Sequence, residues 1–348
     1  MTSIEDVDEE KTSTSTTTTR RSIDQETKKP TISSMISSSS SSSNVQMETT
    51  TKKRIQGELI CHGDHIILYA NPSNVQSVYL KPKEILNNRT GSFYHDDIVG
   101  QRYGSKVYSR TNGKWMYVLK PTPELWTRTL PHRTQIIYSL DSHIICYKLG
   151  LKAGSVVVES GTGSGSLSHH FLRCVGSSGH LHTFEFNAHR AETARNEFKR
   201  HGIDKHVTVT CCDVCAVGFG EQLNGRVDAV FLDLPSPWSA VSHAERALKP
   251  NGNICSFSPC IEQVQRTCEQ LRKHHFNRIE TVEVLLKTYD VVVAASSNRT
   301  NTNDDAHGET TKRRRLTRPR AAMRGHTSYL TFARKAPRTR VEGEKEEE

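Results

Sequence analysis

The chain has 348 residues, of which 34% are hydrophobic, and its formal net charge is +9. This length accommodates one large domain or two modest ones, and the positive charge favours an anionic partner. Nothing in it approaches the roughly 18 consecutive apolar residues of a membrane span, and the N-terminus lacks the apolar core of a signal peptide. We therefore expect a soluble intracellular protein without a membrane partner.

Both ends of the chain are predicted to be tails outside the folded domains. Residues 1–54 contain long Ser and Thr runs, mixed charge and no aromatic residue. Burial of so few apolar groups cannot offset the entropy of ordering them, so we expect a disordered, low-complexity tail. Residues 341–348 form a short acidic tail.

Residues 55–130 show short apolar runs separated by turn residues, which predicts a small β-rich domain. The pair Asn112-Gly113 lies directly before the apolar run from Lys114 to Val118. Because both residues of the pair tolerate a positive φ, we expect a hairpin with a type I′ turn.

Residues 131–340 alternate between strand-like runs and amphipathic helical stretches, which predicts an α/β fold with a mostly parallel sheet. One helix is expected from Ala188 to Arg200, with Asn187 capping its start and Gly202 ending it. The expected strands are Ser155 to Glu159, His180 to Phe186, Val207 to Asp213, Ala229 to Leu234, Asn253 to Phe257, Thr281 to Val293 and Thr327 to Lys335.

The last two expected strands have no helical pattern between them, so we expect a final antiparallel pair. A polar insert over residues 294–322, expected to be disordered, joins the two strands. It contains a dense basic run, namely Lys312, Arg313, Arg314, Arg315, Arg318 and Arg320. Such a run is typical of a nuclear localisation signal, of an RNA-binding arm, or of both. The alternative is a solvated insert with neither function.

The nine cysteines are mostly single within apolar segments, as in a reducing compartment, and indicate no disulfide framework. Cys212 and Cys215 form one C-x-x-C, but no second ligand pair follows, so no metal site is predicted and both are interpreted as buried thiols. Cys260 has no neighbour that would activate it and is interpreted as a pocket wall or structural residue. Three histidines in helical patterns are interpreted as solvated or capping groups: His169, His170 and His243.

A glycine-rich loop follows the first strand of the α/β region. The run from Val156 to Glu159 leads directly into Gly161-Thr-Gly163-Ser-Gly165, and a helical pattern follows. Glycines let the backbone pass close under a ligand at the carboxyl end of a strand, where doubly wound sheets bind ligands. A dinucleotide fold has a glycine where Ser166 stands, so the spacing is instead similar to the S-adenosylmethionine loop of Rossmann-like methyltransferases. A glycine turn that binds nothing is the alternative.

Acidic residues end three successive strands. Glu159 precedes the glycine loop, Glu185 lies 20 residues after Gly165 (185 − 165), and Asp213 ends the third strand. At that spacing Glu185 can accept hydrogen bonds from both ribose hydroxyls of a cofactor, and Asp213 can accept from an adenine amino group. Three acids at three strand ends favour a cofactor site over unrelated surface acids.

The fourth strand ends in Asp233-Leu-Pro-Ser-Pro-Trp238. Two prolines stiffen this loop and free carbonyls for a substrate, and the pattern loosely resembles the acid-Pro-Pro-aromatic loop of enzymes that methylate base nitrogens. Methylating adenine N1 creates a cation, so a carboxylate near the exocyclic amine would stabilise the charge and could take the amine proton. Asp233 is the candidate for this role, and a structural turn with a capping Asp is the alternative.

Several long stretches together resemble the catalytic subunits of tRNA (adenine-58-N1) methyltransferases, and the resemblance covers about residues 55–337. The stretches are Pro131-His-Arg-Thr-Gln-Ile-Ile-Tyr138, Glu159-Ser-Gly-Thr-Gly-Ser-Gly-Ser166, Gly179-His-Leu-His-Thr-Phe-Glu185, Phe231-Leu-Asp-Leu-Pro-Ser-Pro-Trp238, Cys255-Ser-Phe-Ser-Pro-Cys-Ile-Glu-Gln-Val264 and Gly325-His-Thr-Ser-Tyr-Leu-Thr-Phe332.

This resemblance implies a Rossmann-like class I methyltransferase domain with a seven-stranded sheet, which uses S-adenosylmethionine to methylate N1 of adenine 58 in the T-loop of tRNA. It also implies a nuclear location and a two-plus-two heterotetramer with a related noncatalytic subunit. The reacting base would lie at Asp233. The implied cofactor contacts are Ile137, Ser164, Gly165, Ser166, Glu185, Arg190, Asp213 and Val214.

Two other functions stay open from the residues alone. A noncatalytic RNA-binding subunit could keep this fold without its chemistry, although the intact glycine loop, Glu185 and Asp233 argue against it. A nicotinamide-dependent dehydrogenase is disfavoured by Ser166, which stands where the third glycine of a dinucleotide loop belongs.

Overall fold

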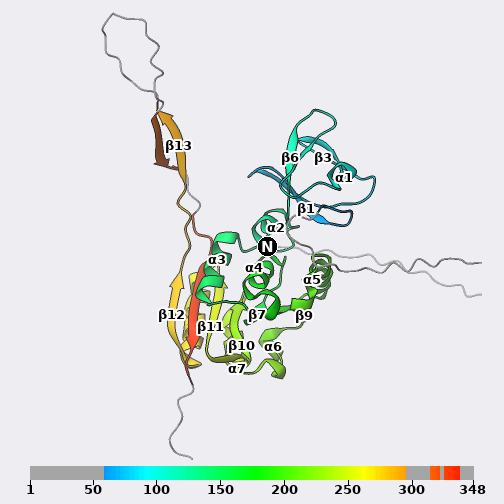
Figure 1. Cartoon of the computed structure of the whole chain (residues 1–348). Helices are drawn as coiled ribbons and strands as arrows, with labels where there is room; N and C mark the ends of the chain where they lie inside the picture. Colours follow the sequence, from blue (N-terminus) through cyan, green and yellow to red (C-terminus); the bar gives the residue numbers. More distant parts are fainter. Residues whose placement is uncertain (1–58, 295–313, 322–324, 338–348) are drawn as a thin grey trace, which may run out of the picture. The chain divides into compact units, whose positions relative to one another are not determined.

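The computed structural model describes residues 59–294, 314–321 and 325–337, all within a compact unit that begins at Arg54 (Figure 1). Both predicted tails, 1–54 and 341–348, lie outside the described residues. Within the described part, no helix is both long enough and apolar enough to span a bilayer.

The first described segment is a small β domain, as expected for residues 55–130. Its core is one apolar cluster in which Ile66, Leu68, Phe93 and Met116 are completely buried. A four-stranded antiparallel sheet has the order β2-β1-β6-β5, and a second strand pair and a short helix complete the domain. The elements are β1 (His65–Asn71), β2 (Asn74–Tyr79), β3 (Ile85–Asn88), β4 (Gly91–Tyr94), α1 (His95–Ile98), β5 (Lys106–Tyr108) and β6 (Trp115–Leu119).

Strands β5 and β6 form the predicted hairpin, but the prediction of its turn type was wrong. Residues 109–114 connect the strands, and although Gly113 has a φ of +67°, Asn112 is not among the described residues with a positive φ. The Asn112 side chain instead donates to the Thr90 carbonyl (2.8 Å) and accepts from the Lys114 amide (3.0 Å). These local hydrogen bonds hold a longer loop in place of a two-residue turn.

Helix α2 (Pro123–Thr129) lies at the end of the range predicted as β-rich. The Thr122 side chain accepts from the Leu125 amide at its start (3.3 Å), and a proline occupies the first helical position. The helix packs against α4 (Ser166–Val175), where the hydroxyls of Thr127 and Ser166 lie 2.8 Å apart. It therefore connects the β domain to the glycine loop, which α4 follows.

The second segment is a seven-stranded sheet with the order β12-β15-β11-β10-β7-β8-β9, covered by helices (Figure 1). Only β15 runs against its two neighbours, so the predicted mostly parallel sheet and final antiparallel pair are confirmed. The strands are β7 (Val156–Ser160), β8 (His180–Glu185), β9 (Val207–Cys211), β10 (Val227–Leu232), β11 (Leu248–Ser258), β12 (Phe276–Val282) and β15 (Tyr329–Lys335). The remaining helices are α3 (Ser139–Lys148), α5 (Ala188–Arg200), α6 (Val214–Val217), α7 (Val241–Ala247) and α8 (Ile261–Lys273).

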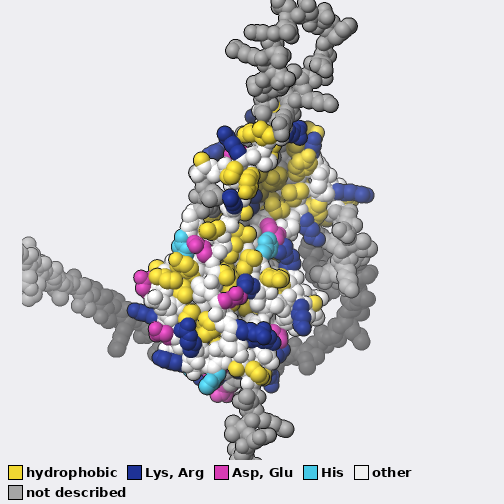
Figure 2. All heavy atoms as spheres, turned by 90° about the vertical axis from the view of Figure 1, so that its left-hand side faces the viewer, with side chains coloured by type: hydrophobic (Ala, Val, Ile, Leu, Met, Phe, Trp, Pro, Cys, Tyr) yellow, Lys and Arg dark blue, Asp and Glu magenta, His cyan; other side chains and the backbone are white. Residues whose placement is uncertain are grey.

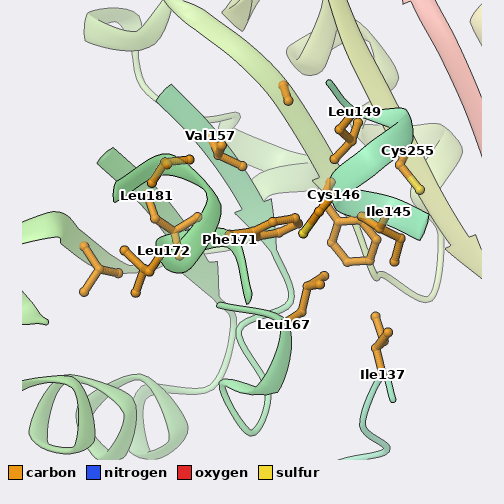
Figure 3. Close-up of a cluster of buried hydrophobic side chains, with 14 of the residues drawn as sticks. Ile137, Ile145, Cys146, Leu149, Val157, Leu167, Phe171, Leu172, Leu181 and Cys255 are labelled. Atoms are coloured by element: carbon orange, nitrogen blue, oxygen red, sulfur yellow. The ribbon is translucent and has the colours of Figure 1, made fainter. Parts of the chain in front are cut away.

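Alternate residues of the central strands pack on opposite faces of this sheet, since strand side chains have a period of two. Val157 contributes to a cluster with residues of α3, α4 and α5, whereas Val158 contributes to one with residues of α7 and α8. Figure 3 shows the first cluster, in which Phe171 of α4 lies between Val157 and Cys146 of α3. The sheet is thus the middle of three layers, which leaves its carboxyl edge open for a ligand.

Helix α5 has the predicted bounds and caps. The Asn187 side chain accepts from the Arg190 amide (3.0 Å), and Gly202 takes a φ of +69° after the last turn. Both interactions are local, which is why the sequence alone predicts them.

The predicted strand from Thr281 to Val293 is divided, and this prediction was wrong. Strand β12 ends at Val282, and β13 (Tyr289–Ala294) pairs instead with β14 (Arg314–Pro319) in a separate two-stranded ribbon. The prediction that the whole insert 294–322 is disordered is therefore wrong, because Arg314–Pro319 form β14. In this strand Leu316 lies opposite Val292 of β13. Residues 295–313 lie outside the described residues.

A chain of hydrogen bonds joins the β domain to the glycine loop. The Gly165 carbonyl can only accept, so His169 donates to it from Nδ1 (2.6 Å) and its Nε2 accepts from Nδ1 of His201 (2.9 Å). Nε2 of His201 then accepts from the Tyr79 hydroxyl (2.8 Å). Burial lowers the pKa of His169 to about 4 and that of His201 to about 3, so both rings are neutral at pH 7, as this chain requires.

Candidate active site

A cavity of about 690 Å³ opens at the carboxyl ends of β7, β8, β9 and β10. This is the edge at which open parallel sheets bind ligands. Among the residues that line it are these predicted site residues: Gly161, Gly163, Glu185, Arg190, Asp213, Val214 and Asp233.

The glycine loop needs glycine for space as well as for conformation. Gly161 has a φ of +97°, and a Cβ there would lie 2.4 Å from the Asp233 carbonyl oxygen. Gly163 has a φ of +52°, and a Cβ there would lie 2.7 Å from Oγ1 of Thr134. The absent side chains let the Asp233 loop and the Thr134 segment approach the loop from two sides, so both contribute to the same cavity.

Glu185 lies at the end of β8 as predicted, with only 3% of its surface exposed. Its Oε2 accepts from the Gly163 amide (3.0 Å), and its Oε1 accepts from the Asn187 amide (3.0 Å) and from Arg190 (2.6 and 3.0 Å). Arg190 therefore neutralises and orients this carboxylate. Because Oε2 has one protein donor, it keeps acceptor capacity toward the cavity.

Asp213 and Val214 follow β9 on another wall of the cavity. Oδ1 of Asp213 accepts from the Cys215 amide (2.9 Å) and so caps α6, while Val214 is buried. None of the hydrogen bonds between described residues uses Oδ2 of Asp213. A capping oxygen and a second oxygen directed to a ligand are compatible with one carboxylate.

Asp233 follows β10, and its backbone amide donates to the Ser160 carbonyl (2.9 Å). Its carboxylate takes part in no hydrogen bond or ion pair with any described residue. Burial, and secondly the negative charge of Glu185, raise the pKa of Asp233 to about 6. An unpartnered carboxylate with such a pKa is suited to accept a hydrogen bond or a proton near neutral pH.

The loop after Asp233 is held from outside the cavity. The Gln263 side chain of α8 donates to the Pro235 carbonyl (3.0 Å) and accepts from the Cys260 amide (3.3 Å). The expectation that the loop carbonyls are free for a substrate is therefore wrong for Pro235 and for Ser236, whose carbonyl accepts from the Ser239 amide (3.1 Å). Cys260 has a structural position at the start of α8, as interpreted from the sequence.

Glu159 is buried beneath the glycine loop with 1% of its surface exposed. Its Oε2 accepts from the hydroxyls of Ser168 (2.6 Å) and Thr183 (2.7 Å). Burial raises the pKa of Glu159 to about 7. These contacts support the base of the loop.

The four remaining predicted cofactor residues do not line the large cavity. Ile137, Ser164 and Ser166 line a small adjoining one, whereas Gly165 lines neither and begins α4. The Ser166 hydroxyl donates to the Ile137 carbonyl (3.0 Å). Ser164 Oγ accepts from the amides of two residues of the segment before α3, at 3.0 and 3.2 Å.

That segment, residues 131–138, contributes residues that the sequence reasoning did not single out. Thr134 and Gln135 line the large cavity, and Arg133 forms two bonds with Glu197 of α5 (2.7 and 3.0 Å). No local pattern predicts this pair, because its two members are 64 residues apart and on different elements. Phe186, which is 74% exposed at the cavity wall, was also missed.

The interpretation of the histidines is wrong for His170 and for His169, which bonds Gly165 and His201 instead of solvent. Cys212 and Cys215 are half-buried and line the cavity wall, and burial raises the pKa of each thiol. His170, expected to be solvated or capping, is completely buried. It lies beneath α2, with Nε2 3.4 Å from the Thr127 hydroxyl, because α2 covers that side of α4.

Comparison with known proteins agrees with this geometry. An alignment of 305 positions, which covers 80% of this chain, shows 41% identity to the tRNA (adenine(58)-N(1))-methyltransferase catalytic subunit of Dictyostelium discoideum and covers 98% of that protein. A 233-residue stretch, 66% of the chain, is 45% identical to the protein of that name from Cryptococcus neoformans and spans about half of it, 53%.

Two solved structures share the fold over nearly their whole length. A SAM-dependent O-methyltransferase from Thermotoga maritima is 28% identical with a TM-score of 0.67, covering 80% of this chain and 96% of that one. The tRNA (m1A58) methyltransferase TrmI from Aquifex aeolicus is 26% identical with a TM-score of 0.62, covering 81% and 100%. The expected Rossmann-like methyltransferase fold is thus confirmed.

The family model described as "tRNA methyltransferase complex GCD14 subunit" matches residues 114–315. This match includes the glycine loop, the three acidic strand ends and the Asp233 loop. The chain belongs to this family of tRNA methyltransferase complex subunits.

Proposed function

We propose that this chain is the catalytic subunit that transfers a methyl group from S-adenosylmethionine to N1 of adenine 58 in the T-loop of tRNA. The observation that carries the proposal is the unpartnered Asp233 carboxylate, which shares one cavity with the glycine loop and Glu185. The relatives with 41% and 45% identity are named as catalytic subunits, which favours catalysis over a purely RNA-binding role.

The residues of the cavity fit S-adenosylmethionine. The missing Cβ atoms of Gly161 and Gly163 leave a cradle, Oε2 of Glu185 can accept from a ribose hydroxyl, and Oδ2 of Asp213 can accept from an adenine amine. When bound there, S-adenosylmethionine supplies a methyl group on a positively charged sulfur, and that charge passes to the adenine ring when the methyl group is transferred.

Asp233 supports this reaction electrostatically. With a pKa of about 6 it is mostly ionised at pH 7, so it can accept a hydrogen bond from the exocyclic amine of the substrate adenine and stabilise the charge that develops on the ring. Gln263 holds the loop through Pro235 and so fixes where this carboxylate stands. Orientation of N1 toward the methyl group supplies much of the remaining rate gain, roughly 7 to 11 kcal/mol in well-oriented reactions.

A partner subunit is part of the proposal: two copies of this chain assemble with two copies of a related noncatalytic subunit. The family description names a complex, and the β13–β14 ribbon leaves apolar side chains exposed, including Val291 (68%), Val293 (56%) and Leu316 (42%). Figure 2 looks at the left-hand side of Figure 1, and hydrophobic side chains lie there together with Lys and Arg in the upper part of the view. An isolated two-stranded ribbon is marginally stable in water, so a covering partner would stabilise it.

A nuclear location is also proposed, on the basis of the basic run that continues through β14. Arg315, Arg318 and Arg320 are exposed there. Replacing these three arginines with glutamine in a fluorescent fusion should reduce nuclear accumulation. An unchanged distribution would remove this run from the proposal.

The activity is tested with the chain and its partner, labelled S-adenosylmethionine, and two tRNA transcripts that differ only in having adenine or uridine at position 58. We expect 1-methyladenosine in nuclease digests of the first transcript, by mass spectrometry, and none from the second. Labelling of both transcripts, or of a different nucleoside, would contradict the proposed substrate.

A further inference from the structure

A second cavity, of about 570 Å³, lies between the β domain and the distal ends of α4 and α5. It shares no lining residue with the cavity at the glycine loop. Arg190 lines one cavity and Arg200 the other, ten residues apart on α5 (200 − 190), so about 15 Å of helix separates them. A volume of this size is typical of sites for small organic ligands.

Flat rings form one wall of this second cavity. The rings of His65 and His201 are stacked, with centroids 4.8 Å apart and an interplanar angle of 6°. Trp126 meets both edge-on, at 5.4 Å and 4.7 Å between centroids. Tyr79 also stacks on His65 (4.5 Å, 15°), so the neighbouring rings cover much of His65 and a ligand meets it at its edge. Burial lowers the pKa of His65 to about 4 and that of His201 to about 3, so this wall is uncharged at pH 7 and suits a planar, weakly polar group.

Two cations line the same cavity together with one carboxylate, Asp64, whose Oδ2 accepts from the Cys61 amide (2.9 Å). Lys120 and Arg200 are exposed, and neither takes part in an ion pair with any described residue. Arg200 instead lies over the Tyr79 ring, with 5.3 Å between its guanidinium carbon and the ring centroid. A third cation, Arg173, is already paired with Glu124 (2.5 Å). Lys120 and Arg200 outnumber the Asp64 carboxylate, and two cations beside a wall of rings are complementary to a ligand that combines a flat ring with an anion.

We propose that this cavity binds one unpaired nucleotide of the bound tRNA, with its base against the rings and its phosphate at Lys120 and Arg200. The identity of the RNA rests on the proposed function. Contact with aromatic side chains, face-on or edge-on, beside basic residues is how proteins hold single unpaired nucleotides. The 15 Å of α5 between Arg190 and Arg200 corresponds to about four nucleotides of stacked strand, so a strand that follows this helix can reach both cavities. A free nucleotide has the same chemistry, and the experiments distinguish the two sources.

The first experiment compares two double variants of the full complex. Lys120→Gln with Arg200→Gln should raise the KM for tRNA about tenfold and reduce the slope of log affinity against log salt by about one, because the contacts with one phosphate are lost. The Kd for S-adenosylmethionine and kcat should not change. Lys114→Gln with Lys199→Gln removes two exposed lysines of the same two segments that do not line the cavity, and its KM should stay near that of the unaltered complex. Equal KM values for the two double variants would overturn the proposal.

The second experiment uses Trp126 as a reporter. The chain has three tryptophans, so Trp115→Phe with Trp238→Phe leaves Trp126 alone. Both tRNA and adenosine monophosphate should quench its fluorescence, and Lys120→Gln with Arg200→Gln should weaken both effects about tenfold. Quenching by the mononucleotide together with an unchanged KM for tRNA would assign the cavity to free nucleotides and overturn the proposal, as would the absence of any quenching.

The two proposals fail in distinguishable ways. If the unaltered complex forms no 1-methyladenosine in tRNA, the proposed function fails, whereas quenching of Trp126 by adenosine monophosphate still reports on the cavity. If methylation is normal but the two double variants behave alike, only the second site fails.

Discussion

The surroundings of Asp233 disfavour the ionised form of its carboxyl group, because burial and the charge of Glu185 both raise its pKa. We predict that Asp233→Ala lowers kcat by about 100-fold or more, because the charge that develops on the adenine then lacks a carboxylate. The Kd for S-adenosylmethionine, measured by calorimetry, should change little, because Glu185 and the glycine loop remain. A kcat near normal in this variant would remove Asp233 from the mechanism.

The same carboxylate predicts how the rate depends on pH. Its pKa of about 6 lies above the ordinary range, so the ionised form is lost as the pH falls through 6. We expect kcat to fall about tenfold per pH unit below that point, measured under saturating substrates. In Asp233→Asn this dependence should disappear. Glu159 titrates near pH 7, so Glu159→Gln is the control and should keep the fall below pH 6.

The sequence predicts the acidic residues of the cavity well and its other walls poorly. Glu185, Asp213 and Asp233 each follow a strand with a clear apolar run, and parallel strands bring their carboxyl ends to one edge. Thr134 and Gln135 come from a segment outside the sheet, whose position depends on Ser164 and on the distant pair of Arg133 and Glu197. Contacts at such separations are set by tertiary packing, which no local pattern encodes.

Between elements, the Arg133–Glu197 pair fixes the segment before α3 to α5. The side chains are 16% and 7% exposed, so Arg133→Met leaves a buried carboxylate without a partner and should cost about 3 kcal/mol of unfolding free energy. We also expect a Kd for S-adenosylmethionine about tenfold higher, because Thr134 and Gln135 lose their support. Urea unfolding and calorimetry measure the two effects.

A matched control for this prediction is Arg195→Met. Arg195 lies on the same helix and pairs with Glu192, but the two side chains are 42% and 61% exposed, so water screens the pair. Arg195 also donates to the Val209 carbonyl (2.9 and 3.2 Å), so this variant should lose only about 1 kcal/mol of unfolding free energy, with an unchanged Kd. If Arg133→Met behaves like Arg195→Met, the segment is held in place by other contacts.

Helix α5 and the β13–β14 ribbon show why some elements can be predicted and others cannot. The bounds of α5 follow from Asn187 and Gly202, which act on the adjacent turn. The apolar run up to Val293 looks continuous with β12 in the sequence, but a strand is defined by its partners, and β13 pairs with a segment 20 or more residues away. Register between distant strands is a property of the folded chain.

At the scale of the whole molecule, the exposed ribbon predicts how assembly can be disrupted. Val291→Asp with Val293→Asp places two charges on its apolar side and should shift the complex from four subunits to smaller species in light scattering. Tyr108→Asp is the control, because Tyr108 is similarly exposed (58%) but belongs to the sheet of the β domain. An unchanged mass for the ribbon variant would place the partner on another surface.

The hydrogen-bond chain from Tyr79 through His201 and His169 to Gly165 has only one possible direction, because the carbonyl at its end cannot donate. Any tilting of the β domain would leave a half-buried ring nitrogen without its partner, which costs free energy and would strain the glycine loop through Gly165. The β domain and the seven-stranded domain should therefore unfold in a single calorimetric transition. Proteases should not cleave the chain between them below the temperature of that transition.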